Sequence, residues 1–314
     1  MKQEPPFAVQ VEMTEGCNLF CSFCGVRGIR KKPGKYKFMT VESAYAIAQN
    51  IALAGWNSRI EFAMHGEPTL NPHVQDIIEA FFSVLPHNQL MMLSNGAGLV
   101  KKPKTLINSY FLSGLNILGI DDYSHNPFAK KIKAKVPGEA YPGESDGPHK
   151  KYKYGIQKVI YIQDIKEAKT GGHSTLNNHC GCASPPLRVP MQQRCAKPFR
   201  EIAIRWNGDV AICCNDWRGH YYCGNVVKDY IEKVWNNKPF RIARRMLYNK
   251  DRNFTPCKWC DARSYRVGFL PDKMGKKELR PPTERMVMWA NKHGERKTLA
   301  PIVKRKWETK ERWF

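Results

Sequence analysis

The chain has 314 residues, 42% of them apolar, which suffices for one large domain or two domains of ordinary size. No apolar run is long enough to span a bilayer, and the first residues lack the apolar stretch of a signal peptide, so we expect neither a membrane protein nor a secreted one. The chain has 51 Lys and Arg against 28 Asp and Glu. A net charge of +23 is typical of proteins that bind nucleic acid, and a generally basic surface is the alternative.

The first recognisable element is a strand that leads into a cysteine loop. Apolar and polar residues alternate over residues 7–13, as in a half-buried strand. Cys17, Cys21 and Cys24 follow with the spacing C-x3-C-x2-C. The chain has 11 cysteines and no secretion signal, which indicates thiols and metal ligands in a reducing compartment. We therefore expect a cytoplasmic protein.

Three thiolates in one tight loop can ligate three irons of a cubane iron–sulfur cluster and leave the fourth iron open. The alternatives are a structural zinc site and unligated core cysteines. Structural zinc usually has four ligands in closed geometry, commonly from two C-x2-C pairs, so three thiols at this spacing fit zinc poorly. The loop therefore favours a cluster with an open coordination site.

A strongly basic segment follows the cysteine loop. Residues 27–37 include six basic residues and no acidic one, and glycine and proline interrupt them, which predicts a loop. Because the segment begins three residues after Cys24, it should lie near the mouth of the active site, where it could hold phosphates. The candidate residues are Arg27, Arg30, Lys31 and Lys32.

Helices and strands then alternate along the chain. Strands are expected over residues 59–64, 89–93, 115–120 and 158–165, and helices over residues 41–54 (capped by Thr40), 73–85 and 104–112. This alternation predicts an α/β fold, a parallel sheet of five or six strands that forms a partial (β/α) barrel. Ligands bind at the carboxyl ends of such strands. The polar residues expected at that rim are His65, Glu67, Ser94, Asn95 and Asp121.

The alternation fails between about residues 122 and 153. Lysines, tyrosines and Pro-Gly pairs predict a basic insertion over the barrel mouth, with a short helix over residues 128–136. Such a segment can hold phosphates and stack on bases, or it is a solvated loop. Little structure is expected over residues 166–194, and Cys180 and Cys182 are interpreted as spare thiols or weak candidates for active-site acids.

A second cysteine module follows. A hairpin is expected over residues 202–214 with an Asn-Gly turn, and helices over residues 227–235 and 240–247. Four thiols, those of Cys195, Cys213, Cys257 and Cys260, complete a ligand set whose pattern alone fits either zinc or an iron–sulfur cluster. We therefore expect a barrel over residues 1–190, a small α+β cysteine-rich domain over residues 191–262, and a basic, aromatic extension over residues 263–314.

The cysteine loop, with Phe23 before its third cysteine, resembles the cluster loop of the radical S-adenosylmethionine (SAM) superfamily. Gly66 and Glu67 resemble that family's glycine-glycine-glutamate stretch, which binds the SAM amino group. Ser94 and Asn95 resemble its ribose-contacting segment. The resemblance implies a [4Fe–4S] cluster that chelates SAM, an external reductant of the flavodoxin or ferredoxin type, and a 5′-deoxyadenosyl radical that abstracts hydrogen from a substrate.

His65 departs from this family pattern, because it stands where the first glycine is usual. It is either tolerated there or acts as a catalytic proton carrier.

The second module resembles the SPASM/Twitch extension of radical SAM enzymes in its first cysteine, its Gly-x4-Cys after a hairpin turn and its late C-x2-C. The resemblance implies an auxiliary [4Fe–4S] cluster ligated by Cys195, Cys213, Cys257 and Cys260, as in the shorter form found in an aminocyclitol dehydrogenase. Cys214 and Cys223 are unassigned, so a second auxiliary cluster stays open. The auxiliary cluster either accepts an electron from the substrate, which gives a net oxidation, or shapes the pocket.

Three substrate classes compete. The basic segments favour a nucleotide, most readily one within DNA or RNA, so we expect a nucleic-acid or nucleotide partner and no membrane. A ribosomal peptide is the second class, although the few residues before the first strand leave no room for the usual leader-binding domain. A small molecule such as an aminocyclitol is the third, and it leaves the charge of +23 unexplained.

Overall fold

The computed structural model describes residues 3–29, 34–123, 128–133, 140–141, 149–153, 159–165, 177–183 and 185–262. Much of the predicted basic insertion and the whole C-terminal extension lie outside the described residues. Among the residues that are described, no helix has both the length and the apolar character needed to cross a bilayer.

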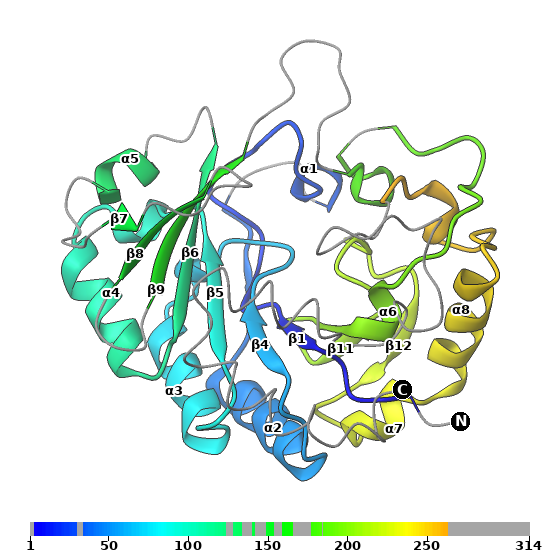
Figure 1. The fold of residues 1–314 in the computed structure, drawn as a ribbon, viewed down its shortest axis with the longest axis horizontal. Helices are drawn as coiled ribbons and strands as arrows, with labels where there is room; N and C mark the ends of the chain where they lie inside the picture. The colour runs from blue at the N-terminus through cyan, green and yellow to red at the C-terminus, as the bar shows by residue number, and fades with distance from the viewer. Residues whose placement is uncertain are drawn as a thin grey trace.

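One curved sheet organises the fold (Figure 1). Its ten strands have the order β12-β11-β10-β1-β4-β5-β6-β9-β8-β7. The central strands run parallel, and they are β1 (Ala8–Val11), β4 (Arg59–Phe62), β5 (Leu90–Ser94), β6 (Ile117–Tyr123) and β9 (Val159–Ile165). The predicted α/β fold with a partial barrel is confirmed.

Helices that connect the parallel strands cover the outer face of the sheet (Figure 1). They are α2 (Val41–Leu53), α3 (Val74–Val84) and α4 (Pro103–Leu112), whereas α5 (Phe128–Lys133) leads from β6 towards β7. In α2, buried residues recur at the helical spacing from Ala44 to Ile51, and the Thr40 hydroxyl accepts a hydrogen bond from the Ser43 amide at 3.2 Å. The N-cap and the apolar stripe therefore fix this helix as the sequence predicts.

The cysteine-rich module continues the same sheet. Strand β10 (Glu201–Ile204) pairs parallel with β1, and β11 (Asp209–Ala211) and β12 (Tyr222–Asn225) extend it antiparallel. The expected hairpin is present, and Gly208 at its turn has a φ of +84°. The two halves also share one core, in which Trp56 packs edge-on against Trp235 with ring centroids 6.2 Å apart.

Several short elements differ from the sequence predictions. Part of the basic segment is ordered rather than loop, because α1 (Val26–Ile29) begins it and β3 (Lys37–Phe38) pairs with β2 (Thr14–Glu15). The insertion contributes β7 (Ala140–Tyr141) and β8 (His149–Lys153), which extend the sheet antiparallel beyond β9.

Helix α7 (Ile231–Trp235) begins four residues later than expected. The Asn225 side chain accepts hydrogen bonds from the amides of Val227 and Lys228, which holds that stretch in a turn. The remaining elements are α6 (Lys197–Arg200), α8 (Lys238–Tyr248) and the 3-10 helices η1 (Pro68–Leu70), η2 (Ala97–Leu99), η3 (His179–Gly181) and η4 (Cys257–Trp259).

Candidate active site

A cavity of about 300 Å³ lies at the carboxyl ends of the parallel strands. Because such strands end at the same edge of a sheet, loops far apart in the sequence meet there. The predicted site residues that line the cavity are Cys17, Cys21, Phe23, Cys24, Gly66, Glu67, Ser94 and Asn95. The structure therefore brings together the three loop thiols and, with the exception of His65, the polar residues expected at the rim, including Asp121.

Gly66 lets the cysteine loop approach the segment that follows β4. The Gly16 amide donates to the His65 carbonyl at 3.1 Å, and the Glu67 amide donates to the Gly16 carbonyl at 3.0 Å. A β-carbon on Gly66 would lie 2.1 Å from the Thr14 carbonyl oxygen, which leaves no room for a side chain. The two backbones are thereby held at a separation that only glycine permits.

Two donors fix the sulfur of Cys17. The Leu19 amide and the Asn95 Nδ2 each lie 3.3 Å from it. The Asn95 side chain is oriented in turn, because its Oδ1 accepts from the Ala97 amide at 2.9 Å. Donors directed at sulfur stabilise a thiolate, which is the form that ligates iron.

The carboxylate of Glu67 is buried among neutral donors. It accepts hydrogen bonds from the Thr69 amide and hydroxyl at 3.1 and 2.5 Å, the Ser94 hydroxyl at 2.6 Å and the Asn95 amide at 2.7 Å. Burial nevertheless raises the pKa of the Glu67 carboxyl above its ordinary value. A cationic group in the cavity would offset that desolvation, so the site fits the amino group of SAM.

The chemistry of the first thiol set also fits an open cluster. Cys17 and Cys24 are partly exposed and Cys21 is buried, and all three sulfur-bearing residues line one cavity. Within the described ranges, no three His, Cys, Asp or Glu side chains converge closely enough to hold a single metal ion. A cubane cluster carries its ligands on different irons, so its thiolates need not converge on one point.

The second thiol set is closed. Cys195, Cys213, Cys257 and Cys260 are all at most 8% exposed. Burial raises the pKa values of Cys213 and Cys257 well above the ordinary range, and the neighbouring thiols act in the same direction. Positively charged iron would compensate for such buried thiolates, so this donor set fits a fully ligated cluster.

A fifth thiol, which the sequence suggested was spare or a weak candidate for an active-site acid, lies against this set. Cys180 in η3 is buried and packs against Cys260 and Ala262. A hydrogen bond with Cys260, together with burial, raises the pKa of Cys180, and the same bond lowers the pKa of Cys260 to about 7. Cys180 and Cys260 lie 80 positions apart with no spacing motif between them, so only the fold reveals the contact.

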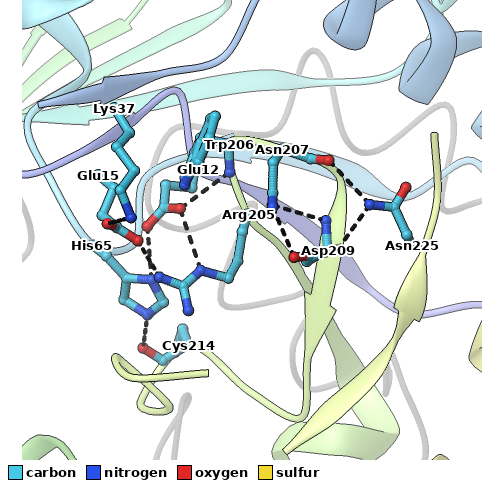
Figure 2. Close-up of polar contacts among 10 residues, drawn as sticks. All are labelled: Glu12, Glu15, Lys37, His65, Arg205, Trp206, Asn207, Asp209, Cys214 and Asn225. Atoms are coloured by element: carbon cyan, nitrogen blue, oxygen red, sulfur yellow. Dashed lines mark hydrogen bonds and ion pairs between the residues drawn. The ribbon is translucent and has the colours of Figure 1, made fainter. Parts of the chain in front are cut away.

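His65 does not line the cavity. Its ring is fully buried, with Nδ1 2.7 Å from Glu12 Oε1 and Nε2 2.9 Å from the Cys214 carbonyl oxygen (Figure 2). The predicted role as a proton carrier is therefore without geometric support. His65 instead connects the segment after β4 to the end of the cysteine-rich hairpin.

Glu12 is the centre of this connection (Figure 2). Its Oε2 accepts from the Trp206 amide at 3.1 Å and lies 3.7 Å from Arg205. Burial acts to raise the pKa of the Glu12 carboxyl, but His65, Arg205 and the Trp206 amide outweigh it and the pKa is lowered. Arg205 also pairs with Glu15, which precedes the first cysteine loop. An ionised carboxylate thus ties the two halves together beside the site.

Most of the residues predicted to bind phosphate stay a prediction. Arg30, Lys31 and Lys32 lie outside the described residues, and Arg27 falls on α1 with its side chain not described. Lys37 pairs with Glu15 at 2.8 Å.

Two ring-bearing residues that line the cavity had no signal in the sequence. They are His179 and Trp217, whose rings lie 5.2 Å apart.

Comparisons with known proteins agree with this geometry. Residues 11–138 match the radical SAM superfamily, and residues 195–261 match SPASM, an iron–sulfur cluster-binding domain. The chain is 31% identical over 99 residues to GTP 3',8-cyclase 2 of Mycobacterium bovis (strain ATCC BAA-935 / AF2122/97), which is 31% of this chain and 27% of that protein. GTP 3',8-cyclase of Mycobacterium marinum (strain ATCC BAA-535 / M) is 28% identical over the same shares. The chain thus spans about a quarter of the length of these relatives.

Among solved structures, the fold is similar to that of BtrN in complex with AdoMet and 2-DOIA. The TM-score is 0.66 at 18% identity, and the match covers 86% of this chain and 98% of that one. This likeness shows a shared fold. The chain therefore contains a radical SAM domain over residues 11–138 and a SPASM-type domain over residues 195–261, and its cofactors are SAM, a SAM-binding [4Fe–4S] cluster and an auxiliary iron–sulfur cluster.

Proposed function

We propose that this enzyme oxidises a small substrate that binds beside SAM in the cavity. The observation that carries the proposal is the contrast between two thiol sets in one sheet. Cys17, Cys21 and Cys24 line an open cavity, where a cluster can keep one iron for SAM. Cys195, Cys213, Cys257 and Cys260 are buried and supply four ligands, which suits an electron acceptor rather than a second SAM site.

Several cavity residues have roles in this proposal. Glu67 binds the SAM amino group, Ser94 and Asn95 orient the Glu67 carboxylate, and Asn95 also orients the Cys17 sulfur. Trp217 and His179 close one wall and limit the access of water. When bound, the two clusters would supply one-electron chemistry: the first would donate an electron to SAM so that a hydrogen-abstracting radical forms, and the second would accept an electron from the substrate radical. A flavodoxin or ferredoxin is the proposed source of the first electron.

Two observations support a small substrate. The described cavity has a volume near the lower end of the range for small-molecule sites. The match with BtrN, whose structure contains AdoMet and 2-DOIA, extends over 98% of that chain.

The same proposal includes a division of the chain near residue 190 into a barrel and a cysteine-rich module. Strands of both parts belong to one continuous sheet.

The test measures SAM consumed against product formed, with 2-DOIA, a free nucleoside and a duplex DNA oligomer as probes. Net oxidation consumes one SAM per product, whereas a redox-neutral rearrangement that returns the radical to SAM consumes far less than one. The Cys257→Ala variant should keep SAM cleavage and lose product, and Cys223→Ala, which removes a buried thiol outside the set, should lose neither. Product formation at the wild-type rate by Cys257→Ala would contradict the proposal.

A nucleotide within nucleic acid is the second candidate, because the net charge of +23 favours it. If six phosphates are contacted, binding to duplex DNA should weaken roughly a thousandfold between about 50 and 200 mM salt. Replacing Arg30, Lys31 and Lys32 with Ala should flatten that dependence and leave SAM cleavage intact. Binding that is insensitive to salt would leave the small-substrate proposal as the better account.

A further inference from the structure

The segment over residues 177–183 lies between the two thiol sets. On one side, His179 lines the cavity and Cys182 packs against Gly28, where an added β-carbon would lie 2.7 Å from the Cys182 β-carbon. On the other side, Cys180 packs against Cys260 in a buried cluster. Adjacent residues of one short segment thus reach both candidate cluster sites.

Hydrogen bonds fasten this segment to the turn that carries Cys257 and Cys260. The Asn178 side chain donates to the Trp259 carbonyl at 2.8 Å, and the Asn178 backbone amide donates to the Asp261 carboxylate at 2.6 Å. The Asp261 amide donates back to the Asn178 side-chain oxygen at 3.3 Å. The position of Cys180 is therefore set by contacts on both sides of Cys260.

The backbone at this point adopts a conformation that non-glycine residues rarely accept. His179 and Cys180 have φ values of +49° and +53°. Two consecutive left-handed residues are unfavourable unless the surrounding contacts compensate. That conformation directs the Cys180 side chain to Cys260 rather than to solvent, which indicates a specific role for the thiol.

We infer that Cys180 is not a ligand but a positioning residue that donates an S–H hydrogen bond to the Cys260 sulfur, and thereby raises the reduction potential of the auxiliary cluster. The inference rests on the proposed function, in which Cys260 is a ligand. A ligating thiolate carries no proton, so of this close pair only Cys180 can be the donor. The Cys260 sulfur already accepts from the Ala262 amide at 3.3 Å, so it would receive two donors. Hydrogen bonds to ligating sulfurs stabilise the reduced, more negatively charged cluster.

The experiment uses the full chain with Cys17, Cys21 and Cys24 replaced by Ala, so that only the auxiliary cluster is present. Cys180→Ala in this background should keep about four irons per chain and lower the midpoint potential in a redox titration followed by electron paramagnetic resonance. Cys182→Ala, which removes the neighbouring thiol, should leave the potential unchanged. Loss of iron in Cys180→Ala would indicate that Cys180 is a ligand. An unchanged midpoint potential would show that the Cys180 hydrogen bond does not affect the cluster. Either result overturns the inference.

A second variant keeps the inference testable if the alanine variant does not fold. Cys180→Ser retains a donor, and a stronger one, so the cluster should keep its iron and have a potential equal to or above that of the parent. A potential below the parent would overturn the inference. Cys260→Ala tests the proposed ligand set separately, because retention of the whole cluster in that variant would show that Cys260 is not a ligand, whatever Cys180 does.

Discussion

The two thiol sets differ in how the chain assembles them. The first comes from one loop of eight residues, and two of its three cysteines are partly exposed on a cavity. The second comes from segments that span residues 195–260, and every member is buried. A local loop leaves room for an incoming ligand, whereas thiols gathered by the fold enclose their site. The contrast explains how one sheet can carry an open, reactive centre and a closed, electron-accepting one.

Removing the open set should have the largest effect. With Cys17, Cys21 and Cys24 replaced by Ala, 5′-deoxyadenosine should fall to background and roughly half of about eight irons should remain. The readouts are iron per chain and SAM cleavage with a chemical reductant. Cys223→Ala is the matched control, since it removes a buried thiol of the shared core and should leave both unchanged. SAM cleavage by the triple variant would show that these three thiols do not hold the SAM-binding cluster.

Glu67→Gln should weaken SAM binding by about 1.5–3 kcal/mol, roughly ten- to hundredfold, because the SAM ammonium would lose its ionised acceptor. Burial raises the pKa of the Glu67 carboxyl, and SAM requires the ionised form. Wild-type affinity should therefore be highest above that raised pKa and decline below it, at a higher pH than for an ordinary glutamate. Calorimetric titration across pH checks both effects.

The Glu67→Gln variant should lack this inflection altogether. Glu79→Gln, on the exposed face of α3, provides the control and should bind SAM as the wild type does. An identical pH profile in wild type and Glu67→Gln would show that the Glu67 carboxylate does not contact the ligand.

His65→Gln should have the smallest catalytic effect. The ring bridges Glu12 and the Cys214 carbonyl, and glutamine cannot span both, so stability should fall by about 1–3 kcal/mol while SAM cleavage persists. Thermal unfolding and 5′-deoxyadenosine formation separate the two effects. His73→Gln, at an exposed histidine that pairs with Asp76, should change neither. Lost cleavage with an unchanged melting temperature would restore the proton-carrier hypothesis.

Sequence patterns predicted what depends on neighbours along the chain. The Thr40 cap, the apolar stripe of α2 and the Asn-Gly turn before Asp209 are local signals, and each produced the expected element. The three loop cysteines belong to the same class, because eight residues contain the whole ligand set. In the second module the pattern indicated the four cysteines, and the family resemblance then favoured an iron–sulfur cluster over zinc.

What the sequence left undetermined depends on contacts between distant segments. Cys180 meets Cys260 only through the hydrogen bonds of Asn178, and His65 meets Cys214 across 149 positions. The lysine-rich strand β8 has no apolar alternation in its sequence, and only the fold shows that it pairs between β7 and β9. The pairing of β10 with β1, which merges the two halves into one sheet, likewise has no local signal.

The most direct test of the contrast is the response of each cluster to SAM. Two variants isolate the centres, one with Cys17, Cys21 and Cys24 replaced by Ala and one with Cys195 and Cys257 replaced by Ala. Electron paramagnetic resonance spectra of the reduced proteins are recorded with and without SAM. The account predicts that SAM changes the spectrum of the variant that retains the first set and leaves the spectrum of the other unchanged. A SAM-dependent change in the cluster held by the buried thiols would contradict it.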